Sequence, residues 1–231
     1  MGLDEMQDLS EISNRLMDGL IFCCKTYKIL ENIKQIKDGI EIVRLQKGIM
    51  NKFIKEVLPI ARYVQMKYRP GRKIEVKWID GYDEYDAYLL SSGFLVDIWE
   101  VEREQFIQVT TAVHQNDYLC RQYFVEKGHS WGPNGTKRDK ITKEVISEPY
   151  VYTNNEHADD FAAIIINRIG EKIKIIYPEN TILLIWCQLN YPFEDSEWSY
   201  MVEKVKNAQL THNFKEISLF DSNFKFFTSL Y

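Results

Sequence analysis

The period of the hydrophobic pattern changes at the turn Arg69–Arg72, which reads RPGR. Apolar residues recur at helical spacing over residues 9–68, whereas residues 73–78 alternate between charged and apolar side chains. The first pattern predicts helices and the second predicts a strand with two different faces. The chain is therefore expected to begin with two or three helices, interrupted near Gly39 and Gly48 because glycine weakens a helix interior, and to continue into a sheet.

Three further segments extend the predicted sheet. Asp80-Gly81 is a turn signal, so residues 85–90 are expected to return as the second strand of an antiparallel hairpin, and residues 106–112 form a third strand. Residues 157–176 carry an apolar stripe at helical spacing, and residues 181–189 form an apolar run of strand length. A strand that follows a long helix favours parallel pairing, so the sheet is predicted to be mixed.

The remaining segments predict shorter elements. Residues 116–127 resemble a short helix with Asn116 as its N-cap, followed by a loop rich in turn-forming residues. Ser196 is a candidate N-cap for a helix near the C-terminus, and residues 216–220 and 224–230 are expected to supply the last strands. Neither a repeat nor a low-complexity tract interrupts this order.

Composition narrows the class of protein. The formal charge of -5 argues against a protein that coats nucleic acid non-specifically, although a local basic groove stays compatible with it. The four cysteines have no CxxC spacing, which favours reduced thiols. The first residues are acidic and lack a signal pattern, and no apolar run approaches membrane-helix length. We expect a soluble cytoplasmic protein without a membrane partner.

Polar residues meet on the predicted sheet. Asp86 alternates with its apolar neighbours on the second strand, and Gln108 and Thr110 share one face of the third strand. If the two strands pair, a carboxylate, an amide oxygen, a hydroxyl and the main-chain carbonyl of Val109 come together. Such an oxygen-rich cluster suits a hard divalent cation such as Mg²⁺.

This arrangement resembles the restriction-endonuclease-like, PD-(D/E)XK nuclease superfamily. A helix, a three-strand antiparallel meander with Asp on the second strand, and then a helix and a buried parallel strand cover residues 52–189. The resemblance implies an α/β (α+β) fold with a mixed sheet flanked by helices. Residues 1–48 would form an N-terminal helical extension and residues 49–231 the nuclease-like domain. The stretch at residues 109–121 is also similar to one in uncharacterised bacterial proteins.

The resemblance assigns roles to these residues. Asp86 takes the place of the aspartate that ligates Mg²⁺ or Mn²⁺, Gln108 takes the place of the acidic ligand, and Thr110 takes the place of the lysine that activates water. Both later positions depart from the pattern, because Gln108 carries no charge and Thr110 cannot supply a cation. The groups that could compensate for these departures are Glu56, Lys77, Asp83, Glu84, His114 and Arg121.

One stretch of this acidic protein is basic. Residues 127–143 contain Lys137, Arg138 and Lys140, with Asp139 as the opposing charge. A flexible basic loop beside a nuclease-type site would contact a DNA backbone together with Arg121. A solvated charged loop is the alternative, and Arg121 could instead pair with the aspartate one helical turn before it.

Three hypotheses follow from the sequence. The first is a divergent metal-dependent nuclease that hydrolyses phosphodiester bonds in DNA, with Asp86, Gln108 and the Val109 carbonyl as metal ligands and Thr110 beside them. The second is a catalytically degenerate protein of the same fold that acts as a binding or regulatory module. The third is a structural interaction protein that forms a homodimer through apolar faces of its N-terminal helices.

Overall fold

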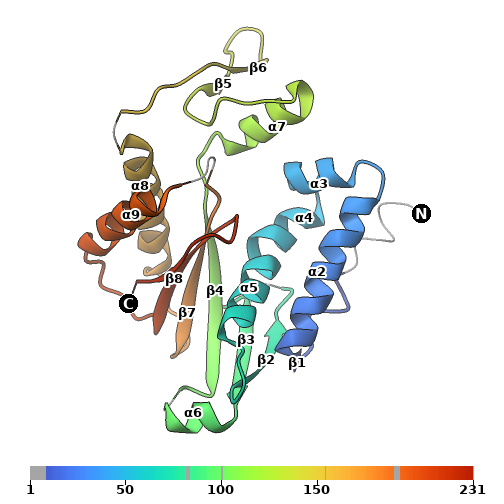
Figure 1. Ribbon diagram of the computed structural model, residues 1–231, viewed down its shortest axis with the longest axis vertical. Helices are drawn as coiled ribbons and strands as arrows, with labels where there is room; N and C mark the ends of the chain where they lie inside the picture. The colour runs from blue at the N-terminus through green and yellow to red at the C-terminus, as the bar shows by residue number, and fades with distance from the viewer. Residues whose placement is uncertain (1–8, 82–83, 100, 154, 190–192, 231) are drawn as a thin grey trace.

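The computed structural model describes residues 9–81, 84–99, 101–153, 155–189 and 193–230. Its main element is a seven-stranded sheet with the order β1-β2-β3-β4-β7-β8-β9 (Figure 1). The strands of this sheet are β1 (Met17–Asp18), β2 (Lys73–Trp78), β3 (Ala87–Ser92), β4 (Glu104–Ala112), β7 (Thr181–Cys187), β8 (Glu216–Asp221) and β9 (Phe227–Ser229). A separate two-stranded sheet pairs β5 (Thr136–Arg138) with β6 (Val145–Ser147).

Helices flank the main sheet on both sides. The helical elements within the described residues are α2 (Gly19–Gln35), α3 (Gly39–Leu45), α4 (Ile49–Lys52), the π-helical turn η1 (Phe53–Val57), α5 (Leu58–Lys67), α6 (Phe94–Ile98), α7 (Asp117–Lys127), α8 (Glu156–Lys172) and α9 (Asp195–Asn207). The N-terminal helices lie on one side of the sheet, while α8 and α9 lie on the other (Figure 1). The protein thus has a mixed α/β fold.

The pairing directions confirm the predicted mixed sheet. Strands β1 to β4 form an antiparallel meander, β4, β7 and β8 run parallel, and β9 is antiparallel to β8. The chain passes from β4 to β7 through α7, the β5–β6 hairpin and α8. Every residue of β7 is buried, as its continuous apolar run predicts.

Two hydrophobic cores fill the space between the sheet and the helices. The first joins α2, η1 and α5 to the sheet and includes Ile107 and Val109 of β4. The second joins α8 and α9 to the other face and includes Ala112. Because side chains alternate along β4, Gln108 and Thr110 lie on the face opposite to Ile107 and Val109. The N-terminal helices therefore share a core with the sheet.

The first helix begins later than its apolar pattern predicts. Helix α2 starts at Gly19, and the two residues before it pair with Glu75 and Val76 at the edge of the sheet. The Asp18 side chain then caps α2 by accepting a hydrogen bond from the Leu20 N–H at 2.9 Å. The interruptions near Gly39 and Gly48 are confirmed, since α3 begins at the first glycine and α4 follows the second.

The antiparallel hairpin predicted around Asp80-Gly81 is confirmed, but these two residues do not form a tight turn by themselves. Trp78 pairs with Ala87, and the Ile79 N–H bonds to the Asp86 carbonyl at 2.9 Å, so the connection is longer than two residues. The second strand consequently starts at Ala87, and Asp86 lies at its entrance. Main-chain pairing between residues far apart in sequence sets this boundary, and the local turn signal does not contain that information.

Ser196 is not a helix N-cap. Glu194 occupies that position, and a capping box links it to Glu197, whose carboxylate accepts the Glu194 N–H at 2.7 Å. Ser196 is the second residue of α9. The sequence pattern also did not predict α6 or the β5–β6 hairpin, which lies against α7 at one end of the molecule (Figure 1).

Candidate functional site

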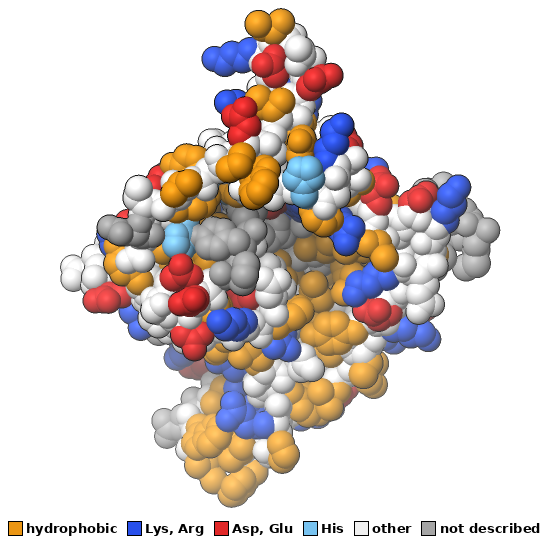
Figure 2. All heavy atoms as spheres, turned by 45° about the horizontal axis from the view of Figure 1, so that its top comes forward, with side chains coloured by type: hydrophobic (Ala, Val, Ile, Leu, Met, Phe, Trp, Pro, Cys, Tyr) orange, Lys and Arg blue, Asp and Glu red, His pale blue; other side chains and the backbone are white. Residues whose placement is uncertain are grey.

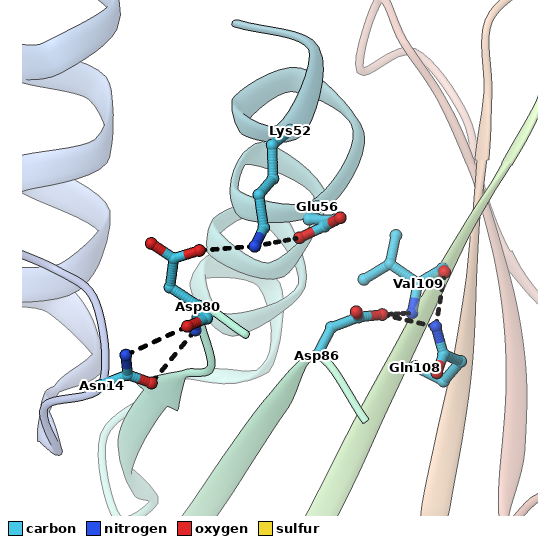
Figure 3. Close-up of polar contacts among 7 residues, drawn as sticks. All are labelled: Asn14, Lys52, Glu56, Asp80, Asp86, Gln108 and Val109. Carbon is cyan, nitrogen blue, oxygen red and sulfur yellow. Dashed lines mark hydrogen bonds and ion pairs between the residues drawn. The ribbon is translucent and has the colours of Figure 1, made fainter. Parts of the chain in front are cut away.

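Asp86 and Gln108 face each other where β3 meets β4. The Asp86 N–H bonds to the Ile107 carbonyl at 2.8 Å, which places Asp86 beside Gln108 on the neighbouring strand. The Gln108 amide donates to Asp86 Oδ2 at 2.6 Å, and the Val109 main-chain N–H donates to the same oxygen at 2.6 Å (Figure 3). Two of the three side chains predicted to converge on this sheet, those of Asp86 and Gln108, are therefore in contact.

The Gln108 amide also reaches a second oxygen. Its nitrogen donates to the main-chain carbonyl of Val109 at 2.9 Å, as well as to Asp86 (Figure 3). One NH₂ group thus bridges a carboxylate and a carbonyl, and Gln108 itself is buried. Two of the three oxygens that the sequence predicts as metal ligands, those of Asp86 and Val109, therefore accept from the amide of the third residue.

Glu56 approaches this cluster from the opposite direction. It lies in the π-helical turn η1, where the Leu58 N–H reaches back five residues to the Phe53 carbonyl. Single π-helical turns of this kind occur often at functional sites. Burial, reinforced by the negative charge of Asp86, raises the pKa of the Glu56 carboxyl to about 7. Burial also raises the pKa of Asp86, although the Val109 N–H opposes the shift.

Lys52 balances part of this negative charge. Its ammonium lies 2.6 Å from Asp80 and 3.9 Å from Glu56 (Figure 3). The same ammonium lies over the Trp78 ring. Asn14 positions the aspartate by accepting the Asp80 main-chain N–H at 3.1 Å. A cavity of about 630 Å³ opens here, lined by Gly48, Asn51, Lys52, Lys55, Glu56, Asp80 and Gly81. Acidic and basic side chains therefore share one open wall beside Asp86.

Thr110 is the third residue of the predicted cluster. It is half-buried and lies in register with Ile185 of β7. Within the part of the chain that the structure describes, no hydrogen bond joins Thr110 to Asp86 or Gln108. The sequence pattern placed Thr110 on the correct strand face, but two strand positions separate it from the contact.

Arg121 and His114, the two candidate residues beyond β4, both have partners in the structure. Arg121 pairs with Asp117 one helical turn earlier, as the spacing indicates, and both side chains are largely buried. The His114 Nδ1 accepts the Asn116 N–H at 3.1 Å. Asn116 precedes the helix as expected, but its side chain donates to the Pro133 carbonyl at 3.3 Å instead of capping the helix.

The basic segment forms the β5–β6 hairpin and its turn. Lys137, Arg138 and Lys140 are all exposed. Lys137 lies 3.7 Å from Glu148, which directly follows the paired strand, and Arg138 donates to the Lys143 carbonyl at 2.8 Å. The hairpin therefore carries acidic residues that the linear basic pattern did not include, which reduces its local charge.

Two cations near Arg121, Lys55 and Arg168, were not predicted from the sequence. Burial, together with the positive charges of Arg121 and Arg168, lowers the pKa of Lys55. Lys55 comes from η1, whereas the two arginines come from α7 and α8. Only tertiary packing places these three side chains near one another, so no local motif could have found them.

Comparisons with protein-family models, with curated proteins and with solved structures found no match for this chain. Its function must therefore be argued from the site itself. Of the earlier candidates, Glu84 is exposed and Asp83 lies outside the described residues. None of the helices within the described ranges is long and apolar enough to cross a bilayer.

The donor set can be tested against a divalent cation. Mg²⁺ requires oxygen ligands with free lone pairs, mostly from carboxylates. Here the Gln108 NH₂ group is directed at both Asp86 Oδ2 and the Val109 carbonyl. In the described segments, no group of three or more His, Cys, Asp or Glu side chains is arranged to hold a metal ion. The arrangement around Gln108 therefore does not fit the metal that the sequence resemblance implies.

Proposed function

We propose that this protein has a restriction-endonuclease-like fold and binds DNA without hydrolysing it. The observation that carries the proposal is the Gln108 amide, which bridges Asp86 Oδ2 and the Val109 carbonyl. A neutral donor here stabilises the buried carboxylate without a cation. In this proposal, Asp86 and Gln108 take the places of the two acidic ligands of a nuclease centre, and a hydrogen bond joins them.

The topology supports the fold assignment. The helical segment η1–α5 leads into the antiparallel meander β2-β3-β4, and α8 then leads into β7, which pairs parallel to β4. Asp86 lies at the entrance to the second strand of the meander, and Gln108 lies on the third. Both the order of elements and the places of these two residues agree with the superfamily pattern.

Positive charge supports the choice of ligand. Lys55, Arg121 and Arg168 gather near the carboxyl end of β4, and the hairpin adds the exposed Lys137, Arg138 and Lys140. Burial is the largest cause of the lowered pKa of Lys55; the charges of Arg121 and Arg168 add to it, and Asp117 opposes it. A polyanion such as the DNA backbone would find neighbouring cations here.

A second candidate function is Mg²⁺- or Mn²⁺-dependent hydrolysis of a phosphodiester in DNA. One observation favours it: Glu56 shares a charged environment with Asp86, and its pKa is raised to about 7. Two neighbouring carboxylates are a common feature of cation sites. The orientation of the Gln108 amide weighs against this candidate.

A nicking assay separates the two candidates. Supercoiled plasmid is incubated with the protein in Mg²⁺ or Mn²⁺, and the Asp86→Asn variant is assayed in parallel. The proposal predicts intact plasmid with both proteins. Nicking by the parent that disappears in Asp86→Asn would support hydrolysis and overturn the proposal. The matched control is Glu84→Gln, because Glu84 is an exposed acidic neighbour.

A further inference from the structure

Two adjoining cavities lie between α3, α7 and the carboxyl end of β7. Their volumes are about 420 and 460 Å³, and they share Arg44, Asp117, Arg121 and Leu189 in their walls. Figure 2 shows a hollow in this face, with hydrophobic side chains on its floor and basic side chains at its border. In open α/β sheets, the carboxyl ends of parallel strands are the usual place for ligands. The size is that of a small-molecule site.

Apolar side chains form much of the lining. They come from the N-terminal helices, from α7 and from the end of β7, and include Val43, Ile54, Leu58, Phe124, Trp186 and Leu189. Phe124 offers exposed aromatic surface in one cavity, whereas Trp186 lines the other and is almost fully buried. A flat, largely apolar ligand ring therefore has surface to pack against.

Two arginines supply positive charge to the same space. The Arg44 guanidinium lies over the Phe124 ring at 5.0 Å from its centroid. Among the described residues, Arg44 has no ion-pair partner. Arg121 gives one guanidinium nitrogen to Asp117, and about a quarter of its side chain stays exposed. Two arginines against one aspartate leave the pocket with a net positive charge, which suits an anionic group.

We infer that this pocket binds a nucleotide, with its phosphate between Arg44 and Arg121 and its base against the apolar lining. The inference rests on the proposed function, since it identifies part of the DNA that the protein would hold. The same chemistry is present in a free nucleoside monophosphate and in the 5′-phosphorylated end of a strand. The charged and apolar parts of the pocket match the two halves of either ligand.

Tryptophan fluorescence provides the test, because Trp186 lies in the pocket wall. Adenosine monophosphate, inorganic phosphate and a short single strand with or without a 5′-phosphate are titrated separately. We expect the monophosphate and the phosphorylated strand to bind, and the Arg44→Gln variant to bind them about tenfold more weakly. Arg44 is the residue of choice because its replacement leaves no buried partner unpaired.

The matched control is Arg103→Gln. Arg103 is an exposed arginine that pairs with Asp97, and it precedes the amino end of β4, away from the pocket. The Arg103→Gln variant should bind the nucleotide as tightly as the parent protein does. Equal loss in both variants would show a general charge effect and overturn the inference.

The outcomes also separate this inference from the proposed function. DNA binding that is unchanged in Arg44→Gln, with no response to the monophosphate, would overturn the pocket and leave the proposed function standing. Binding of the monophosphate without any binding of DNA would support the pocket and overturn the proposed function. Binding of inorganic phosphate as tightly as the monophosphate would overturn the role of the apolar lining.

Discussion

Gln108 donates its side-chain amide to Asp86 across the β3–β4 pair, at 2.6 Å. The same amide reaches the Val109 carbonyl at 2.9 Å, so three groups on two strands form one closed contact. A nuclease-type centre would place a cation among these oxygens, and this chain places a neutral donor there. The proposed function therefore depends on the role of Gln108.

The Gln108→Glu variant tests this contact by replacing the amide with a second carboxylate. Two carboxylates at this distance repel, and the buried position makes the repulsion costly. We expect a loss of about 2 kcal/mol in unfolding free energy without metal, which corresponds to roughly 4–8 °C in the unfolding midpoint. Mg²⁺ or Mn²⁺ should restore part of the loss, because it bridges the oxygens.

The control for this experiment is Gln115→Glu, which makes the same chemical change at an exposed site just beyond β4. Its unfolding midpoint should match that of the parent with or without the cation. A Gln108→Glu protein as stable as the parent in a chelating buffer would contradict the contact described above.

Glu56 predicts a pH dependence of stability. The ordinary pKa of its carboxyl is 4.5, and the folded state raises it to about 7. The unfolded chain therefore loses this proton first, so the stability of the fold decreases as the pH rises from about 4.5 to 7. Glu56→Gln removes this decrease. It should be more stable than the parent at pH 8, by at most about 3 kcal/mol, and nearly equal to it at pH 4.

Chemical denaturation at both pH values measures the difference, with Glu84→Gln as the exposed control. A stabilisation of Glu56→Gln that is the same at pH 4 and pH 8 would contradict the assigned pKa. It would also remove the observation that favours the hydrolytic candidate.

We predict strong energetic coupling between Asp117 and Arg121 in the stability of the fold. Only 10% of the aspartate side chain and 23% of the arginine side chain are exposed. Removing one partner leaves the other charge buried and unpaired, so Arg121→Gln should lose about 2–4 kcal/mol. The double variant with Asp117→Asn should lose less than the sum of the single variants. Additive losses in denaturation experiments would mean that the two side chains do not interact.

The β5–β6 hairpin predicts a salt-dependent effect on DNA retention. Replacing Lys137, Arg138 and Lys140 by Gln should weaken retention at low salt and reduce the slope of log affinity against log salt by less than about three. The reduction stays below this limit because Lys137 already faces Glu148 and Arg138 already bonds to main chain. Affinity measurements over a range of salt concentrations would refute the role of the hairpin if the slope did not change.

Much of the sheet could be predicted from local sequence. The alternation in residues 73–78 and the apolar run at residues 181–187 each reflect the burial of that one strand, so the pattern and the structure agree. The edge strand Met17–Asp18 could not be predicted in this way, because its conformation comes from pairing with β2. The β5–β6 hairpin could not be predicted either, because its strands have only three residues each.

The candidate site also has a part that local sequence predicts and a part that depends on tertiary packing. Alternation within a strand placed Asp86 and Gln108 on a common face, and strand pairing brings them into contact. Alternation could not show that the Gln108 nitrogen points at the carboxylate, because the direction of an amide depends on its final neighbours. Arg44 and Lys55 belong to helices far away in the sequence, so their positions depend on tertiary packing.

DNA binding without hydrolysis is tested most directly by a binding measurement that also reports whether the DNA stays intact. Fluorescence anisotropy with a labelled duplex is performed in a chelating buffer and again in Mg²⁺, and the recovered DNA is examined on a gel. We predict binding in both buffers, of similar strength at matched ionic strength, with intact DNA. Absence of binding, or cleavage in Mg²⁺ by the parent protein, would contradict it.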